Sequence, residues 1–311
     1  MSKVLITGGA GFIGSFVGVA LQKRGYEVYV FDDFNDFLYT SDLKRERVEK
    51  LFEKEPTVIK GSVLDMREID AALRKYKPEL VLHFAALANP GRSLHAAEAY
   101  TKVNVLGTNN VLHAAQHNAA QRVIFSGSSS IYDDAKTPFK EDDWNFKPKS
   151  PYGASKAAAE MYCKMWHELY DLPITVLRFF SVYGPYGRPD MAPMILADKL
   201  IRGEKMEISE GRQRDFTFID DVVVGVLAAI DKQFDYEVIN LGRGEPMAVL
   251  DFVKALEKVT GQTADYEMRE APAGEMRVTY ADISKARRLL GYEPKVSIEE
   301  GARRLVEWMR G

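Results

Sequence analysis

The chain has 311 residues, of which 46% are hydrophobic and 28% charged, and its formal net charge at pH 7 is −3. These values are ordinary for a globular protein, and the slightly acidic balance argues against a protein that binds nucleic acid through a basic surface. The single cysteine, Cys163, excludes an internal disulfide and fits a reducing compartment.

The N-terminal half alternates short apolar runs with helical patterns. The apolar runs predict buried parallel strands at 4–6, 27–31, 57–59, 80–84, 122–127 and 174–179. Helices are expected between most of them, including 12–25, 96–118 and 154–171. This alternation predicts an α/β fold with a doubly wound parallel sheet of the Rossmann type.

Beyond residue 180 the predicted elements are shorter, with helical patterns at 191–203 and 249–261. We therefore expect a cofactor-binding domain over 1–180 and a smaller α/β substrate domain over 181–311, with some chain returning to the first domain near 215–240. The longest apolar run, 222–230, is too short to cross a membrane. The glycine-rich N-terminus is unlike a signal peptide, so a cytoplasmic protein is expected.

The first strand runs into the turn T-G-G-A-G-F-I-G, where Gly8, Gly11 and Gly14 are spaced three apart. Glycine at such a strand-to-helix turn lets backbone N–H groups and the helix N-terminus approach a pyrophosphate. The next strand ends at Asp32, whose carboxylate can accept hydrogen bonds from the adenosine ribose and would repel a 2′-phosphate. Asp33 adds to that repulsion, whereas the cations at 44, 45 and 47 weaken it. The pattern predicts NAD binding.

The segment S-P-Y-G-A-S-K at 150–156 places Tyr152 and Lys156 one helical turn apart. A lysine ammonium beside a phenol should lower the phenol pKa, and Tyr152 could then act as general base or acid on a substrate hydroxyl. A serine cluster, S-G-S-S-S at 126–130, follows a predicted parallel strand at the edge where such sheets bind ligands. Each signal is weak alone, but together with the glycine turn they predict an enzyme.

These motifs together resemble the extended short-chain dehydrogenase/reductase family. T-G-G-A-G-F-I-G, H-F-A-A, the serine cluster, Y-G-A-S-K, R-D-F-T-F-I-D-D and T-Y-A-D-I-S-K-A follow the family's order over nearly the whole chain. Within the family, residues 32–51 and R-F-F-S-V-Y-G-P-Y-G-R-P-D-M-A at 178–192 are most similar to UDP-glucuronate 4-epimerases. The resemblance implies hydride transfer from C4 to tightly held NAD⁺ while Tyr152 takes the O4 proton. The hydride then returns to the other face of the 4-keto sugar.

The resemblance also implies roles for individual residues. The matching catalytic positions are Ser128, Tyr152 and Lys156, and Lys156 would also hold the nicotinamide ribose. The implied cofactor-binding positions are Gly8, Gly11, Phe12, Ile13, Gly14, Asp32, Asp33, Val63, Ala85 and Lys156. The implied substrate contacts are Arg92, Ser128, Ser130, Tyr152, Ser181, Arg188, Arg214 and Arg277.

The resemblance implies a specific function for two pairs of these residues. Arg188 and Ser181 match the pair that holds the C5 carboxylate, which discourages decarboxylation because loss of CO₂ requires that carboxylate to rotate. Arg214 and Arg277 match positions that bind the nucleotide diphosphate. Related dehydratases and decarboxylating enzymes carry an acid where this chain has Ser129 or Ser130, which favours simple epimerisation.

One stretch, A-A-L-A-N-P-G-R-S at 85–93, departs from the glucuronate pattern. It has Gly91-Arg92 where those epimerases carry Arg-Tyr, and it is similar to UDP-N-acetylhexosamine 4-epimerases. A UDP-glucose or UDP-N-acetylglucosamine 4-epimerase is therefore the second candidate. A non-catalytic NAD-binding regulator on the same fold is an alternative of another class, against which the complete set of catalytic residues argues.

The remaining expectations concern metals and partners. His113 and His117 have a spacing that can bind metal, but the sequence offers no third ligand, so no metal site is expected. Family members commonly pack the helices expected at 96–118 and 154–171 into a four-helix bundle between subunits, which implies a homodimer. The expected partner is a UDP-sugar substrate, with neither nucleic acid nor a membrane.

Overall fold

The computed structural model describes residues 2–132, 135–143, 147–270 and 276–311. Within these residues, seven strands form one parallel sheet in the order β11-β6-β5-β4-β1-β2-β3. The bounds are β1 (Lys3–Thr7), β2 (Glu27–Asp32), β3 (Thr57–Lys60), β4 (Leu80–His83), β5 (Arg122–Ser128), β6 (Ile174–Phe179) and β11 (Tyr236–Leu241). The predicted fold class is confirmed.

The central strands are apolar because both of their faces are covered. In β1, Val4 and Ile6 pack into one hydrophobic core, whereas Leu5 packs into the core on the opposite face. All three side chains are fully buried. This two-sided burial explains why the strand reads as a continuous apolar run instead of alternating with polar residues.

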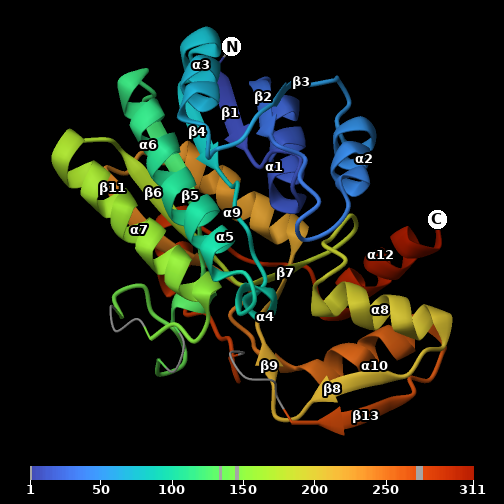
Figure 1. Cartoon of the computed structure of the whole chain (residues 1–311). Coiled ribbons are helices and arrows are strands. Elements are labelled where there is room, and N and C mark those ends of the chain that lie inside the picture. Colours follow the sequence, from blue (N-terminus) through green and yellow to red (C-terminus); the bar gives the residue numbers. More distant parts are fainter. Residues whose placement is uncertain (1, 133–134, 144–146, 271–275) are drawn as a thin grey trace.

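Helices cover both faces of the sheet (Figure 1). The first face carries α3 (Met66–Tyr76), α6 (Gly107–His117) and α7 (Pro151–Tyr170), which pack in sequence against one another. The other face carries α1 (Phe12–Lys23), α9 (Ile219–Asp231) and α11 (Ser284–Leu290), and α2 (Ser41–Leu51) packs beside α1.

The helix predicted at 96–118 is interrupted. It consists of α5 (Ala97–Thr101), a π-helical segment at Lys102–Leu106 and then α6. The short helix α4 (Pro90–Ser93) precedes it at the end of the chain segment that follows β4. A π segment inside an α-helix often marks a functional site, and this one contains Asn104, described below.

The C-terminal elements form a second group at the carboxyl edge of the sheet, seen at the lower right of Figure 1. Its strands are β7 (Ser181–Tyr183), β8 (Met206–Ser209), β9 (Gln213–Arg214), β10 (Phe216–Phe218), β12 (Met247–Ala248) and β13 (Tyr266–Arg269). Its helices are α8 (Ala192–Arg202), α10 (Val249–Thr260) and α12 (Ile298–Arg310). Between these elements the chain returns to the large sheet through α9 and β11.

The sheet order reverses between β1 and β4, which are neighbours although two strands separate them in sequence. Chain segments leaving these two strands diverge to opposite sides, and the crevice outside their carboxyl ends is the usual ligand site in such sheets. None of the described helices combines the length and the apolar character needed to cross a membrane.

Candidate active site

A cavity of about 570 Å³ lies at this carboxyl edge, between the large sheet and the C-terminal group. Its walls include the glycine turn after β1, the ends of β2, β4 and β5, the start of α7, and residues of the segments 179–196 and 207–214. The cavity therefore joins the predicted cofactor residues to the predicted catalytic and substrate residues.

The glycine turn leaves no room for side chains. A Cβ on Gly8, whose φ is +68°, would lie 2.6 Å from the backbone nitrogen of Ala85, and a Cβ on Gly14 would collide with the Gly8 carbonyl oxygen. Among the described side chains none caps the start of α1, where Gly11 is the N-cap. The N–H groups of the first turn are thus free to bind a phosphate, which fits the pyrophosphate of NAD.

Asp32 ends β2 and is held by backbone donors. Its Oδ2 accepts from the Ala10 N–H at 3.2 Å and its Oδ1 from the Phe34 N–H at 2.9 Å. Burial raises the pKa of Asp32, and the ammonium of Lys44, 3.9 Å away, acts in the opposite direction. The carboxylate is therefore fixed in the cavity wall, as binding of a ribose hydroxyl requires.

Of the three cations near Asp32 that could favour a 2′-phosphate, at positions 44, 45 and 47, two form hydrogen bonds within the protein. Lys44 Nζ donates to the Asn35 carbonyl oxygen at 2.8 Å. Arg47 is fully buried and donates to the Tyr39 hydroxyl at 2.8 Å and to the Tyr186 carbonyl oxygen at 2.8 Å. Arg47 thus connects the cofactor side of the cavity to the loop that carries Arg188.

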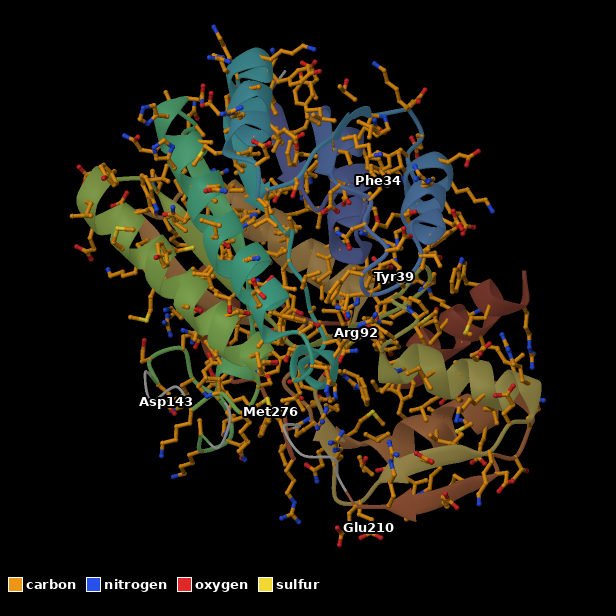
Figure 2. All side chains as sticks on the ribbon, viewed as in Figure 1. Phe34, Tyr39, Arg92, Asp143, Glu210 and Met276 are labelled. Atoms are coloured by element: carbon orange, nitrogen blue, oxygen red, sulfur yellow. The ribbon has the colours of Figure 1, made fainter. Side chains whose placement is uncertain are left out.

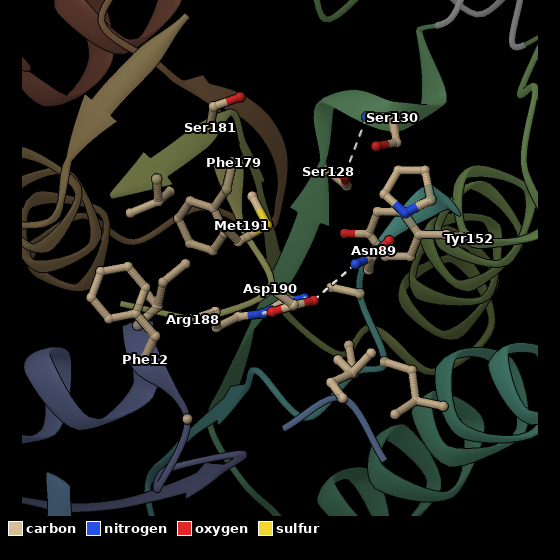
Figure 3. A pocket seen from close by; sticks show the side chains of 18 of the residues that line it. Phe12, Asn89, Ser128, Ser130, Tyr152, Phe179, Ser181, Arg188, Asp190 and Met191 are labelled. Atoms are coloured by element: carbon tan, nitrogen blue, oxygen red, sulfur yellow. Dashed lines mark hydrogen bonds and ion pairs between the residues drawn. The ribbon is translucent and has the colours of Figure 1, made fainter. Parts of the chain in front are cut away.

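The predicted catalytic residues Ser128, Tyr152 and Lys156 all line the cavity, and Figure 3 shows Ser128 and Tyr152. Tyr152 and Lys156 lie in the first turns of α7, whose N-cap is Ser150. Ser128 is the last residue of β5 and lines the same cavity, and its hydroxyl lowers the pKa of the Tyr152 phenol. Lys156 Nζ lies 3.4 Å from Ser126 Oγ. The phenol, the Ser128 hydroxyl and the Lys156 ammonium thus line one cavity, and their catalytic roles stay a prediction.

The pKa of Tyr152 differs from the expectation. Burial raises it, and the groups that lower it are the hydrogen bond from Ser128 and the charge of Arg188. The pKa of Tyr152 is thus raised, whereas the sequence led us to expect a lowered value from Lys156 and bound NAD⁺ together. Burial also lowers the pKa of Lys156 itself to about 8, which reduces the fraction of lysine that carries a charge.

Asn104 lies in the π segment and was not predicted as a site residue. Its side chain accepts from the Leu87 N–H at 2.8 Å and donates to the Leu87 carbonyl oxygen at 2.8 Å and to Ser155 Oγ at 2.9 Å. Ser155 Oγ in turn donates to the Tyr152 carbonyl oxygen at 2.8 Å. Asn104 therefore fixes the segment after β4 relative to the helix that carries Tyr152.

Arg188 lies in the cavity wall and is paired within its own loop. Its Nε and Nη2 donate to the two carboxylate oxygens of Asp190 at 3.0 and 2.6 Å. The Arg188 side chain is 17% exposed, so it is not the solvated surface arginine that its loop position alone would suggest. Ser181, at the start of β7, also lines the cavity.

The other predicted substrate residues divide into two groups. Ser130 and Arg214 line the cavity, and Arg214 Nη1 donates to the Gln213 carbonyl oxygen at 2.8 Å. Arg92 and Arg277 are exposed and are not part of the cavity wall. Arg92 (Figure 2) instead lies over the Phe37 ring, at 5.3 Å from its centre.

The metal prediction concerned a histidine pair on α6. The rings of His113 and His117 are stacked, with their centres 4.6 Å apart. Within the ranges that the structure describes, no group of three metal-ligating side chains includes them.

Comparison with known proteins finds a matching family model and relatives that align over nearly the whole chain. The family model described as GDP-mannose 4,6 dehydratase matches residues 5–305. A UDP-glucuronate 4-epimerase of Thermodesulfobacterium geofontis is 37% identical over 314 residues, which is 100% of this chain and 97% of the relative.

Two solved structures extend the likeness to three dimensions. The UDP-glucuronic acid 4-epimerase of Bacillus cereus, in complex with UDP-glucuronic acid and NAD, superposes with a TM-score of 0.92 at 33% identity, covering 99% of each chain. The UDP-glucose 4-epimerase of Thermus thermophilus, in complex with NAD, gives a TM-score of 0.90 at 29% identity, again over 99% of each chain.

Proposed function

Because the chain belongs to the GDP-mannose 4,6-dehydratase family of extended short-chain dehydrogenases/reductases, we propose that it is an NAD-dependent UDP-sugar 4-epimerase whose substrate is UDP-glucuronate. The product would be UDP-galacturonate, and the reaction would consume no cofactor, because the hydride taken from C4 and the proton taken from O4 both return to the sugar. The observation that carries the choice of substrate is Arg188, a partly buried guanidinium in the wall of the cavity that holds Tyr152.

The cofactor fits the chain's own residues. The glycine turn and the start of α1 would bind the pyrophosphate, Asp32 the adenosine ribose, and Lys156 the nicotinamide ribose. When bound, NAD⁺ would accept the hydride from C4, give it back to C4, and place a positive charge beside the reacting groups.

Tyr152 is the proposed base for the O4 proton. Its pKa is raised by burial, so the phenolate needs stabilisation, which the Ser128 hydroxyl and the positive charge of Arg188 provide. Removing the proton from O4 lets a carbonyl form at C4. The same tyrosine returns the proton to O4 when the carbonyl is reduced from its other face.

Arg188 and Ser181 are the proposed receivers of the C5 carboxylate. A guanidinium offers five donors in one plane. The pair with Asp190 uses the edge formed by Nε and Nη2, so the adjacent edge formed by Nη1 and Nη2 can receive a second carboxylate. At the end of β5 the side chains at 129 and 130 are hydroxyls. No acid is placed there for an elimination or ring step, which favours simple epimerisation.

A second candidate activity is 4-epimerisation of a neutral sugar, UDP-glucose or UDP-N-acetylglucosamine. The observation in its favour is that Asp190 already neutralises Arg188, so the site carries less net positive charge toward a carboxylate than the sequence suggests. The UDP-glucose 4-epimerase of similar fold fits this alternative as well.

The experiment that tests the proposal is incubation of the purified protein with UDP-glucuronate and no added NAD, with the sugar products resolved by NMR. Formation of UDP-galacturonate would support epimerisation, retained cofactor and acceptance of the carboxylate together. Turnover of UDP-glucose or UDP-N-acetylglucosamine but not of UDP-glucuronate would select the second candidate. Absence of turnover with all three sugars, from protein that releases NAD on denaturation, would refute the epimerase assignment.

A homodimer in the cytoplasm completes the proposal. The helix α7 and the π segment expose large apolar side chains, among them Leu106, Met161, Leu169 and Tyr170. We propose that a second copy of the chain covers this face. We also propose that the domains divide near residue 180, with the chain near 215–240 returning to the first. Light scattering should give twice the monomer mass, and a Met161→Asp, Leu169→Asp double variant should be monomeric. A monomeric wild-type protein would refute the dimer.

A further inference from the structure

The Arg188–Asp190 pair is connected to the opposite wall of the cavity. Asp190 Oδ2, which accepts from Arg188 Nη2, also accepts from the side-chain amide of Asn89 at 2.9 Å (Figure 3). Asn89 follows β4, whereas Asp190 lies in the loop after β7, so the contact joins residues that are 101 positions apart in sequence. The pair is largely buried, with Asp190 only 15% exposed.

The amide of Asn89 is fully oriented. Its Nδ2 donates to Asp190 and its Oδ1 accepts from the Arg92 N–H at 3.0 Å, where it caps α4. The Asn89 backbone has a φ of +96°, a conformation that is costly for any residue except glycine. Such a conformation persists when surrounding contacts determine it, and the hydrogen bond to Asp190 is one of these contacts.

The segment that carries Asn89 is also attached to the catalytic helix. Tyr100 Oη donates to the carbonyl oxygen of Asn89 at 3.0 Å. Four residues further on, Ser93 Oγ accepts from the Tyr152 backbone N–H at 3.1 Å. A continuous set of hydrogen bonds and short chain segments thus leads from Arg188 to Tyr152.

We propose that Asn89 and Asp190 form a latch that positions Arg188 relative to Tyr152, and that this latch sets the preference for a uronate over a neutral sugar. The proposal rests on the proposed function. In a uronate the carboxylate on C5 is adjacent to the reacting hydroxyl on C4, so the two binding groups must keep a fixed separation. Small displacements of a binding group at a reacting centre have large effects on rate. Asn89 and Asp190 are positioning residues here, since neither needs to touch the sugar.

The test uses two variants of Asn89 in the protein with its bound NAD. N89G removes the amide but tolerates the positive φ. N89D keeps the oxygen that caps α4 and replaces the donor to Asp190 by a carboxylate. Affinities for UDP-glucuronate and UDP-glucose are measured by calorimetry, and KM and kcat are measured with UDP-glucuronate. L94A, at an exposed side chain that follows the same short helix, is the matched control.

The latch predicts that N89G lowers the affinity for UDP-glucuronate about tenfold, the effect of losing one hydrogen bond to a charged group, and changes the affinity for UDP-glucose less than twofold. N89D should lose at least as much affinity for UDP-glucuronate, and L94A should bind both ligands as tightly as wild type. If N89D behaves like wild type while N89G does not, helix capping explains the effect and the latch is wrong. Equal losses for both ligands, or unchanged affinities, would also overturn it.

The failure of the latch can be told apart from the failure of the proposed function. Wild-type protein that converts UDP-glucuronate, together with Asn89 variants of unchanged preference, refutes the latch alone. Wild-type protein that neither converts UDP-glucuronate nor binds it better than UDP-glucose refutes the assigned substrate. NAD released from each variant on denaturation should equal that of wild type, and a loss of NAD would refute a local positioning role.

Discussion

The ammonium nitrogen of Lys156 lies 4.5 Å from the centre of the Phe125 ring, and the lysine is only 3% exposed. This burial lowers the pKa of Lys156 from its ordinary value of 10.5 to about 8. The protein therefore keeps the Lys156 ammonium in a buried position that disfavours its charged form. We attribute this to the proposed contact with the nicotinamide ribose, for which a neutral side chain would not serve.

Removing this cation should stabilise the fold at neutral pH. Between pH 8 and pH 10.5 the unfolded chain still holds the Lys156 proton that the native state has released, so stability rises with pH across that window. Lys156→Met should gain up to about 3 kcal/mol in free energy of unfolding at pH 7, at about 1.4 kcal/mol for each pH unit, and the gain should shrink toward pH 10.5. Urea unfolding of cofactor-free protein at several pH values measures this.

The exposed Lys50 provides the control for that series, since Lys50→Met should show no comparable trend with pH. A stability difference between Lys156→Met and wild type that stays constant from pH 7 to pH 10.5 would show that the charge of Lys156 is not the cause.

Tyr152→Phe should remove the proposed base while keeping the shape of the side chain. We expect the rate of UDP-glucuronate conversion to fall about 10³-fold, within the range of general acid–base catalysis. NAD content and UDP-glucuronate affinity should change little, because the ring still packs against Tyr100. NMR of the products measures the rate, with Tyr266→Phe, at an exposed tyrosine, as control. Conversion at the wild-type rate would exclude Tyr152 as the base.

Arg188→Ala should weaken binding of the uronate and leave its carboxylate unrestrained. We expect the apparent affinity for UDP-glucuronate to fall about 10- to 100-fold, as for loss of a charge-assisted pair, and a decarboxylated pentose product to appear. Arg202→Ala is the control, because Arg202 also pairs with an aspartate but on the surface, at 3.0 Å from Asp198. An unchanged affinity and product profile in Arg188→Ala would assign the carboxylate to other residues.

Gly14→Ala should abolish retention of NAD. The added methyl group would meet the Gly8 carbonyl oxygen and displace the turn that approaches the pyrophosphate. Absorbance of dinucleotide released from denatured protein measures the loss. Gly25→Asn is a suitable control, because the space around Gly25 is open and asparagine tolerates its φ of +82°. Normal NAD content in Gly14→Ala would show that the turn does not bind the cofactor.

Glu160→Gln should destabilise the fold. Glu160 forms a buried ion pair with Arg178, which also donates to the Tyr132 hydroxyl at 2.6 Å. Breaking such a pair leaves an uncompensated buried charge and costs about 3–5 kcal/mol. Urea unfolding should show this loss, whereas Glu46→Gln at the exposed pair with Lys50 should cost less than about 1 kcal/mol. Equal effects of the two substitutions would contradict this view.

The sequence predicted the strands and the cofactor turn well, because local rules determine them. The run around Val4, Leu5 and Ile6 is apolar since both faces of β1 are covered, and Gly14 faces a backbone oxygen. The family resemblance is confirmed by the relatives reported above. The π segment at Lys102–Leu106 was not predicted, because the apolar pattern over 96–118 continues through it without a break.

The missed features depend on contacts between distant parts of the chain. Asn89 and Asp190 have no local signal, since each is an ordinary loop residue until the fold brings the two loops together. The pKa of Tyr152 was predicted in the wrong direction because the sequence gives the distance along the helix to Lys156 but not the degree of burial. Arg92 was predicted in the site from its motif, whereas its side chain packs on Phe37 outside the cavity wall.

The position of β11 limits how this protein could be divided or recombined. This strand comes from the C-terminal half, yet it pairs with β6 at the edge of the large sheet. A fragment ending near residue 180 would expose the N–H and C=O groups of β6 and invite edge-to-edge aggregation. Grafting the second half of a relative onto this chain would also exchange one strand of the cofactor sheet. Chimaeras that aim to alter sugar preference should therefore exchange the loops around Asn89 and Arg188 and keep β11 native.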